Sequence, residues 1–147
     1  MITVRTLNLE ESKMLIDAAA AKSAEIGCKH VICIADNAGY PIALHRMDGG
    51  KITSVQIAQN KAFTSAGHKR KTHTFTNTYP GEEAWGIFTQ FEGRFTVFVG
   101  GYPIELAGEV VGGIGVSGGN GEQDTAVCEA ALEVWEDYVK AKGLDKA

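Results

Sequence analysis

The chain has 147 residues, of which 44 % are hydrophobic and 22 % are charged, and this balance argues against disorder, collagen-like structure and a membrane protein. Its net charge of −4 is a poor match for general nucleic-acid binding, which requires a basic face. We therefore expect neither nucleic acid nor a membrane among its partners. Glycine is in excess, with 18 residues, and the excess is concentrated between Gly100 and Gly121.

The length fits one domain, and no linker or internal repeat divides the chain, so we expect a single domain over residues 1–147. Three cysteines, Cys28, Cys33 and Cys128, have neither metal-binding nor redox-motif spacing. An odd number of cysteines without a disulfide framework favours a reducing compartment. Because no signal peptide or membrane-spanning apolar run is visible, the sequence predicts a cytoplasmic protein.

In the first half of the chain, Asn8 followed by Glu11 has the spacing of a capping box and predicts a helix over residues 9–26, which Gly27 ends. Two short runs of β-forming residues, 31–35 and 41–47, flank turn-forming residues and predict a β-hairpin. A second helix is expected over residues 54–67, with Thr53 or Ser54 as its cap.

In the second half, Pro80 is expected to open a short helix that carries Trp85 and Phe88. Strands are expected at 95–99, at 103–106 on a sheet edge, and at 110–117. The glycine-rich turn at 118–121 then leads into a last helix. This order predicts an α+β layered domain with a mostly antiparallel, five-stranded sheet.

The glycines divide into two groups. Gly112, Gly113 and Gly115 lie inside a predicted strand, where they favour the close approach of a helix or, alternatively, of a ligand. Ser117 and Gly118 belong to a turn before the last helix, where free amides and the helix dipole can bind a carboxylate or phosphate. The turn lacks the Lys-Ser/Thr pair of a P-loop.

Three charged side chains are candidates for a site. Arg46 and Asp48 follow a predicted strand, where they form either a structural ion pair or a site in which Arg46 binds a carboxylate and Asp48 orients the loop. Lys61 lies on the apolar side of the second predicted helix. Its amine either reaches solvent past apolar neighbours, binds an anion, or has a lowered pKa.

The basic segment, residues 68–73, holds His68, Lys69, Arg70, Lys71 and His73 and is either a solvated loop or a place beside which a small anion binds. The four histidines of the chain lack the spacing of a zinc site, so no structural metal is expected. A single histidine, or Met47, stays open as an axial iron ligand.

Several short motifs, in consistent order along the chain, resemble the GlcG/HbpS family, also called the haem-degrading domain family. They are Asp36-Asn37-Ala38-Gly39, Arg46-Met47-Asp48-Gly49, Lys61-Ala62-Phe63-Thr64-Ser65-Ala66, Gly100-Gly101-Tyr102-Pro103-Ile104, Gly112 to Gly119, and Gln123-Asp124. The same domain is similar to the C-terminal half of PduO-type proteins, whose adenosyltransferase half has no counterpart here. The resemblance implies a profilin-like, three-layer α/β/α sandwich around a five-stranded antiparallel sheet, assembled into dimers or octamers.

The resemblance also implies a pocket for a carboxylated ligand, either haem through its propionates or a small hydroxy or keto acid. Its residues are Arg46, Asp48, Lys61, Gly100, Gly101, Ser117, Gly118 and Asp124. The first hypothesis is therefore a haem- or tetrapyrrole-binding accessory protein. The second is a cofactor-independent enzyme of a catabolic operon, acting on a small carboxylated or carbonyl metabolite, with Lys61 or His45 as the base. The third is a structural oligomer without catalysis.

Overall fold

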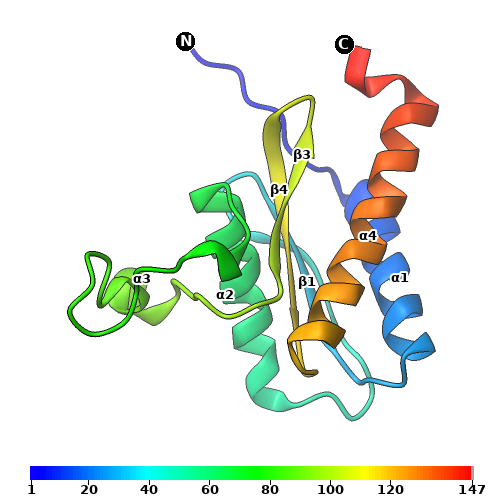
Figure 1. Cartoon of the computed structure of the whole chain (residues 1–147). Helices are drawn as coiled ribbons and strands as arrows, with labels where there is room; N and C mark the ends of the chain where they lie inside the picture. The colour runs from blue at the N-terminus through cyan, green and yellow to red at the C-terminus, as the bar shows by residue number, and fades with distance from the viewer. Residues whose placement is uncertain (147) are drawn as a thin grey trace.

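The computed structural model describes residues 1–146 as a layered α+β fold (Figure 1). Its helices and strands, in chain order, are α1 (Leu9–Glu25), β1 (Val31–Asp36), β2 (Pro41–Arg46), α2 (Ile52–His68), α3 (Gln90–Gly93), β3 (Gly101–Leu106), β4 (Glu109–Ser117) and α4 (Gly121–Lys142). Single 3₁₀ turns follow α2, precede α3 and follow α4; they are η1 (Thr72–Thr74), η2 (Ile87–Thr89) and η3 (Leu144–Lys146).

The sheet is antiparallel and has four strands in the order β2-β1-β4-β3. Helices α1 and α4 lie side by side on one face, and α2 covers the other (Figure 1). Val31 of β1 pairs with Arg46 on one side and with Ser117 on the other, so these three residues form one row across the sheet. Side chains in such a row point to the same face.

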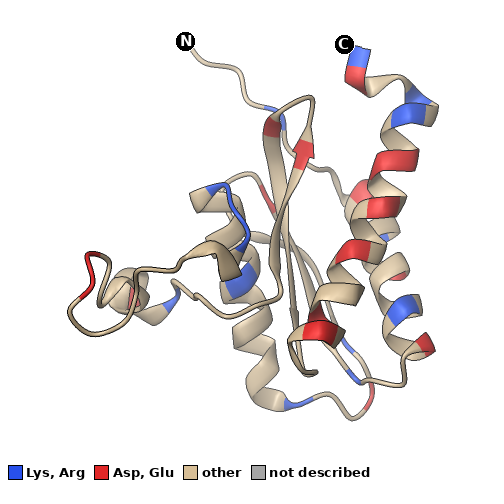
Figure 2. Cartoon of the chain, in the orientation of Figure 1, with Lys and Arg blue, Asp and Glu red and all other residues tan. Residues whose placement is uncertain are grey.

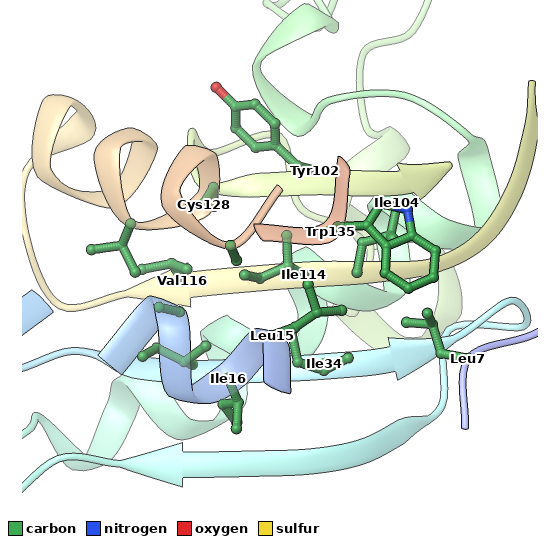
Figure 3. Close-up of a cluster of buried hydrophobic side chains, with 14 of the residues drawn as sticks. Leu7, Leu15, Ile16, Ile34, Tyr102, Ile104, Ile114, Val116, Cys128 and Trp135 are labelled. Carbon is green, nitrogen blue, oxygen red and sulfur yellow. The ribbon is translucent and has the colours of Figure 1, made fainter. Parts of the chain in front are cut away.

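The larger core lies between the sheet and the α1/α4 layer, where Leu15 and Ile16 of α1 meet Ile114 of β4 and Trp135 of α4 (Figure 3). The core under α2 is thin because its members are small. They are Val31, Cys33, Ala35, Ala58 and Ala62. Burial raises the pKa of the Cys33 thiol to about 12, so this thiol stays protonated and unreactive at neutral pH.

Close packing explains the strand glycines, as the sequence predicted. A Cβ atom on Gly115 would collide with the carbonyl oxygen of Ala58, and one on Gly113 would lie 2.6 Å from the carbonyl oxygen of Ala62. Helix α2 therefore rests directly on the backbone of β4. This contact fixes where the side chains of α2 reach the end of the sheet.

The local helix signals were read correctly at α1 and incorrectly at α2. The Asn8–Glu11 capping box is formed, with both hydrogen bonds at 2.8–2.9 Å. Helix α2 begins at Ile52, before the two residues expected to cap it. Ser54 instead lies inside the helix, and its buried hydroxyl is 3.1 Å from the hydroxyl of Ser117. That contact ties the start of α2 to the end of β4.

The predicted fifth strand is wrong, because residues 95–99 do not pair with the sheet. Two threonine hydroxyls bind the backbone of this segment instead. Thr64 of α2 accepts a hydrogen bond from the amide of Thr96 at 3.0 Å, and Thr72 of η1 donates one to the carbonyl oxygen of Phe98. Strand β3 begins two residues earlier than expected, and it lies at the sheet edge as Pro103 predicted.

The helix expected to open at Pro80 is also wrong, because Pro80 lies in a turn. Residues 75–94, which we name the aromatic arm, form turns, η2 and the one-turn α3. In α3, Phe91 and Glu92 have left-handed φ angles of 54° and 58°, so the turn is not a regular helix. The arm extends away from the sheet on the α2 side (Figure 1). It provides a wall of its own beside α2.

Charge is unevenly distributed over the layers. Acidic residues recur along α4, and basic residues lie close together in the segment after α2 (Figure 2). Within residues 1–146, no helix combines the length and the apolar character that crossing a membrane requires.

Candidate functional site

A large cavity lies between α2 and the aromatic arm. Its volume is about 960 Å³, which is at the upper end of the range for small-molecule sites. We name it the aromatic cavity. It is lined by Ile57, Asn60, His73, Phe75, Thr76, Thr78, Tyr79, Trp85, Phe88, Gly93, Phe95, Thr96, Val97, Phe98 and Val99. Apolar and aromatic walls with a few polar groups are typical of sites for flat organic ligands.

The threonine contacts described above hold one wall of this cavity. Thr64 is bound to the amide of Thr96, and its hydroxyl is 3.4 Å from the carbonyl oxygen of Arg94. Thr72 accepts from the amide of Gly101 at 3.0 Å as well as donating to Phe98. Residues 95–99 are therefore fixed against α2 and η1 by side chains, and all five residues contribute to the lining of the cavity.

The basic segment runs beside the cavity. The guanidinium of Arg70 lies 4.5 Å from the ring centre of Phe75, and the ammonium of Lys71 lies 5.0 Å from that of Tyr102. The ring of His73 also packs against Tyr102, with the centroids 5.8 Å apart. Because Phe75 and His73 line the cavity, positive charge stands next to an apolar space. This combination suits a ligand with both a flat apolar body and acidic groups.

At the end of the sheet, four side chains form a buried polar chain that crosses the layers. Ser23 of α1 contacts Nδ1 of His30 at 2.7 Å, and Nε2 of His30 contacts Asp124 of α4 at 3.0 Å. The other carboxylate oxygen of Asp124 accepts from Nζ of Lys61 at 3.2 Å. All four residues are at most 5 % exposed.

Asp124 is the centre of this chain. Burial alone would raise the pKa of its carboxyl, but the hydrogen bond from His30 and the charge of Lys61 outweigh that effect and hold the pKa below its ordinary value. The Gly119 amide also donates to Asp124, at 2.9 Å. The anion that the turn before α4 binds is thus the carboxylate of the protein's own Asp124.

Lys61 is bound on two sides. Besides Asp124, its ammonium donates to the carbonyl oxygen of Val116 at 2.7 Å, and a Cβ on Gly100 would lie 2.9 Å from Nζ. Lys61 is also only 3 % exposed, so an external carboxylate has little access to its ammonium. Gly100 therefore leaves room for the ammonium of Lys61, and Gly101 leaves room for the side chain of Thr72.

The structure brings together part of the predicted pocket. Lys61, Gly100 and Asp124 are in contact, and Gly118 lies beside the backbone of His30. His30 is the member of this cluster that sequence reasoning missed. No local motif marks it, because it meets Asp124 across 94 residues of sequence.

Arg46 and Asp48 lie apart from this cluster. They line a separate pocket of about 340 Å³, which we name the rim pocket, together with Met47, Gly49, Gly50 and Ile52. Within residues 1–146, Arg46 and Asp48 form no ion pair with each other, because their nitrogen and oxygen atoms are more than 4.0 Å apart. Met47 belongs to this pocket and not to the lining of the aromatic cavity.

The two candidate bases lie on opposite faces of the sheet. His45 pairs with Ile32, whose side chain belongs to the core under α1 and α4. Lys61 belongs to α2, on the other face. One substrate cannot contact both. Burial also raises the pKa of the Cys128 thiol, so this cysteine is a poor nucleophile.

Most of the cavity lining was not predicted as a site. The aromatic residues were assigned to a short helix and to a strand, which would have separated them. In the described part of the chain, no three His, Cys, Asp or Glu side chains gather in a group that could hold a metal ion.

Comparison with curated proteins gives relatives over most of the chain. An uncharacterized 15.0 kDa protein in the dhaT-dhaS intergenic region of Citrobacter freundii is 35 % identical over 135 residues, which are 91 % of this chain and 95 % of that protein. The corrinoid adenosyltransferase PduO of the same organism is 33 % identical over 86 % of this chain, which spans only 38 % of PduO. Protein GlcG of Escherichia coli is 29 % identical, over 80 % of this chain and 85 % of GlcG.

Solved structures share the fold. Protein ORFY of Klebsiella pneumoniae superposes with a TM-score of 0.90 at 31 % identity, over 92 % of this chain and 94 % of ORFY. A PduOC:heme complex superposes with a TM-score of 0.83 at 28 % identity, over 88 % of this chain and 94 % of the other. A family model described as "Haem degrading protein HbpS-like" matches residues 7–133. The chain therefore belongs to the HbpS-like family, and it is related to GlcG and to part of PduO, as its sequence motifs indicated.

Proposed function

We propose that this protein binds haem or a closely related tetrapyrrole in the aromatic cavity. The observation that carries the proposal is the cavity itself, which has the volume, the flat apolar walls and the neighbouring cations that a dicarboxylic macrocycle requires. Membership of the HbpS-like family and the similarity to a PduOC:heme complex support the same ligand.

The residues that line the cavity match the chemical groups of haem. Phe75, Phe95 and Trp85 offer apolar surface for the macrocycle, and His73 offers an imidazole of the kind that binds haem iron. When bound, haem supplies an iron centre that can carry electrons or bind oxygen. The protein supplies apolar walls that exclude water from the macrocycle and cations that orient its acidic edge.

The carboxylates of the ligand need positive partners, and two places offer them. Arg70 and Lys71 lie beside the aromatic cavity, whereas Arg46 lies in the rim pocket. We propose that the basic segment is the partner. The glycine-rich pocket implied by the resemblance is the alternative, but there Lys61 and the Gly119 amide already bind Asp124.

A hemin titration of the purified protein tests the proposal. We expect a saturable shift of the Soret band, weakened about tenfold or more by Phe88→Asp, because this change places a charge in the cavity wall. The matched control is Phe91→Asp, since Phe91 is in the same arm, is 62 % exposed and does not line the cavity. No saturable shift in the wild type, or equal effects of the two variants, would contradict the proposal.

Two further variants locate the carboxylates. Lys71→Ala is expected to weaken hemin binding, because Lys71 belongs to the basic segment beside the cavity. Arg46→Ala and Lys61→Met are expected to leave it within about twofold, because Arg46 lies in the rim pocket and Lys61 is buried against Asp124. If Arg46→Ala alone weakens binding, the ligand carboxylates lie in the rim pocket and the assignment to the basic segment is wrong.

The rim pocket supports a second candidate function, the binding of a small organic acid. Its volume of about 340 Å³ is too small for a tetrapyrrole, and Arg46 there is not ion-paired with Asp48. In a thermal-shift screen, we expect a hydroxy or keto acid to raise the melting temperature of the wild type. This increase in melting temperature should be absent in Arg46→Ala. Stabilisation that survives in this variant would exclude the rim pocket. Lys61 and His45 do not line it, so a base for catalysis is not proposed there.

The resemblance implies assembly with copies of the same chain as dimers or octamers, and we propose such assembly. Large hydrophobic side chains on the arm and its continuation are exposed to solvent, and burying them against a second copy would be favourable. They are Tyr79, Trp85, Phe88, Phe91 and Phe98.

A further inference from the structure

The four histidines of the chain have different surroundings, and only one of them lines the aromatic cavity. His30 is fully buried, and both of its ring nitrogens are bound within the buried polar chain. His45 lies on the opposite face of the sheet. The ring of His68 packs between those of Phe75 and Phe95, with centroids 5.1 and 5.3 Å away. His73 alone faces the cavity.

The ring nitrogens of His73 are free to bind a ligand. Within residues 1–146, the side chain of His73 makes no hydrogen bond or ion pair; its contact is the packing of its ring against Tyr102. A neutral imidazole in this setting offers an unused lone pair, which is the group that binds haem iron. Packing against the buried ring of Tyr102 restrains this exposed imidazole.

The backbone that carries His73 is anchored on both sides. Before it, Thr72 is fully buried and bound to Phe98 and Gly101. After it, the hydroxyl of Thr74 donates to the carbonyl oxygen of Lys71 at 2.7 Å, and the guanidinium of Arg70 binds both the hydroxyl and the carbonyl oxygen of Thr74. The imidazole is therefore presented from a fixed turn, as a metal ligand should be.

We propose that His73 is the axial ligand of the iron in the bound haem. This inference rests on the proposed haem function. It names the atom that binds the iron, a ring nitrogen of His73 that donates its lone pair. Lys71, two residues before His73, also packs on the ring of Tyr102, with its ammonium 5.0 Å from the ring centre, and we assign it to a carboxylate of the same ligand. One short turn would thus supply both the iron ligand and an anchor for the acidic edge.

The test compares iron protoporphyrin with metal-free protoporphyrin IX, which has the same macrocycle and carboxylates. For His73→Ala, we expect hemin affinity to fall about tenfold or more, with a changed Soret position and changed electron paramagnetic resonance of the ferric iron. Affinity for metal-free protoporphyrin IX, followed by its fluorescence, should change by less than about twofold. His73→Gly should regain the wild-type spectrum when imidazole is added.

Each alternative result has a distinct meaning. If the wild type does not bind hemin, the proposed function fails and the inference falls with it. If the wild type binds hemin and His73→Ala keeps the same spectra, the haem function stands and the assignment of the ligand is overturned. Equal losses for hemin and for metal-free protoporphyrin IX would make His73 a packing residue and would also overturn the assignment. Because His73 is exposed, both variants are expected to fold, which their unfolding midpoints verify.

Discussion

Asp124 shows how one carboxylate can hold three parts of the fold together. It receives hydrogen bonds from His30 before β1, from Lys61 on α2 and from the Gly119 amide before α4. A buried cation that loses its partner is costly, because its charge is then uncompensated in a medium of low polarity. The buried ammonium of Lys61 makes this carboxylate necessary, and its role in the structure is independent of any ligand.

We expect Asp124→Asn to lower the free energy of unfolding by about 3 kcal/mol at pH 7, as is typical when a buried ion pair is broken. The effect depends on pH. Because the folded-state pKa of Asp124 is below its ordinary value, the carboxylate contributes stability above the unfolded pKa, about 4, and loses it as the pH falls through the folded pKa. Urea unfolding should therefore show a smaller difference between wild type and variant at pH 3 than at pH 7.

The matched control is Glu109→Gln, which removes the partner of Arg5 in an exposed ion pair with both side chains about 40 % exposed. Exposed pairs contribute little, so we expect a small change at both pH values. A loss as large as that of Asp124→Asn would show that burial is not the reason for the effect. A pH-independent loss in Asp124→Asn would contradict the role assigned to its ionised form.

At the scale of elements, the packing of α2 on β4 depends on the absence of one methyl group. A Cβ on Gly115 would meet the carbonyl oxygen of Ala58 and lie 2.6 Å from the amide nitrogen of Ala62. Both atoms belong to the backbone of α2, so no side-chain rotation can relieve the collision. The helix would have to move away from the sheet and disturb the thin core beneath it.

Gly115→Ala is therefore expected to lower the free energy of unfolding by about 2–3 kcal/mol, as overpacking in a core does. Gly67→Ala is the control, because nothing lies within 4 Å of the added methyl group and the residue is in α2. There, the change should be neutral or stabilising by up to about 1 kcal/mol. Chemical denaturation measures the free energy of unfolding of both variants. If Gly115→Ala leaves this free energy unchanged, the close contact is refuted.

Secondary structure that depends on interactions between residues close in sequence could be predicted. Structure that depends on contacts between residues far apart in sequence could not. The capping box of α1 lies within four residues, and the glycines of β4 show their close contact in the strand pattern. The segment 95–99 has the residues of a strand, yet Thr64 and Thr72 bind its backbone from about 30 residues away. Nothing local predicts that competition.

The site shows the same division. The residue pattern singled out Lys61, and the family resemblance added Asp124, which does meet Lys61. The same resemblance grouped Arg46 with them, although Arg46 lies in another pocket. The alternation of side chains along a strand assigns each residue to one face of the sheet. It does not indicate which loop covers that face. The aromatic cavity was missed because its walls come from residues 57 to 99, in segments whose contact depends on how the arm folds back.

At the scale of the whole molecule, exposed aromatic rings are concentrated in one part of the chain. The aromatic arm exposes several large rings, including Trp85 at 53 % and Phe91 at 62 %. The outer face of α4 is acidic and suits contact with water (Figure 2). Contact between copies is therefore expected on the side of the arm, where burial of apolar surface is favourable.

We expect light scattering to give a mass that is a multiple of 15.7 kDa, in line with the proposed assembly of copies. Because the contact would be apolar, the assembly should persist in about 1 M salt, where exposed ion pairs are screened. A mass of one chain at all concentrations would refute self-association. Dissociation in salt would instead indicate a contact made by charged surfaces.

The threonine contacts of the cavity wall also bear on how the protein opens. Amides of β1 lie between two neighbouring strands and should exchange with deuterium only when the whole fold unfolds. The Thr96 amide is held by one hydroxyl at the edge of α2, so it should exchange through a smaller, local opening. Sheet and wall thus form separate cooperative units. A ligand in the cavity would slow exchange at Thr96 while leaving the β1 amides unchanged.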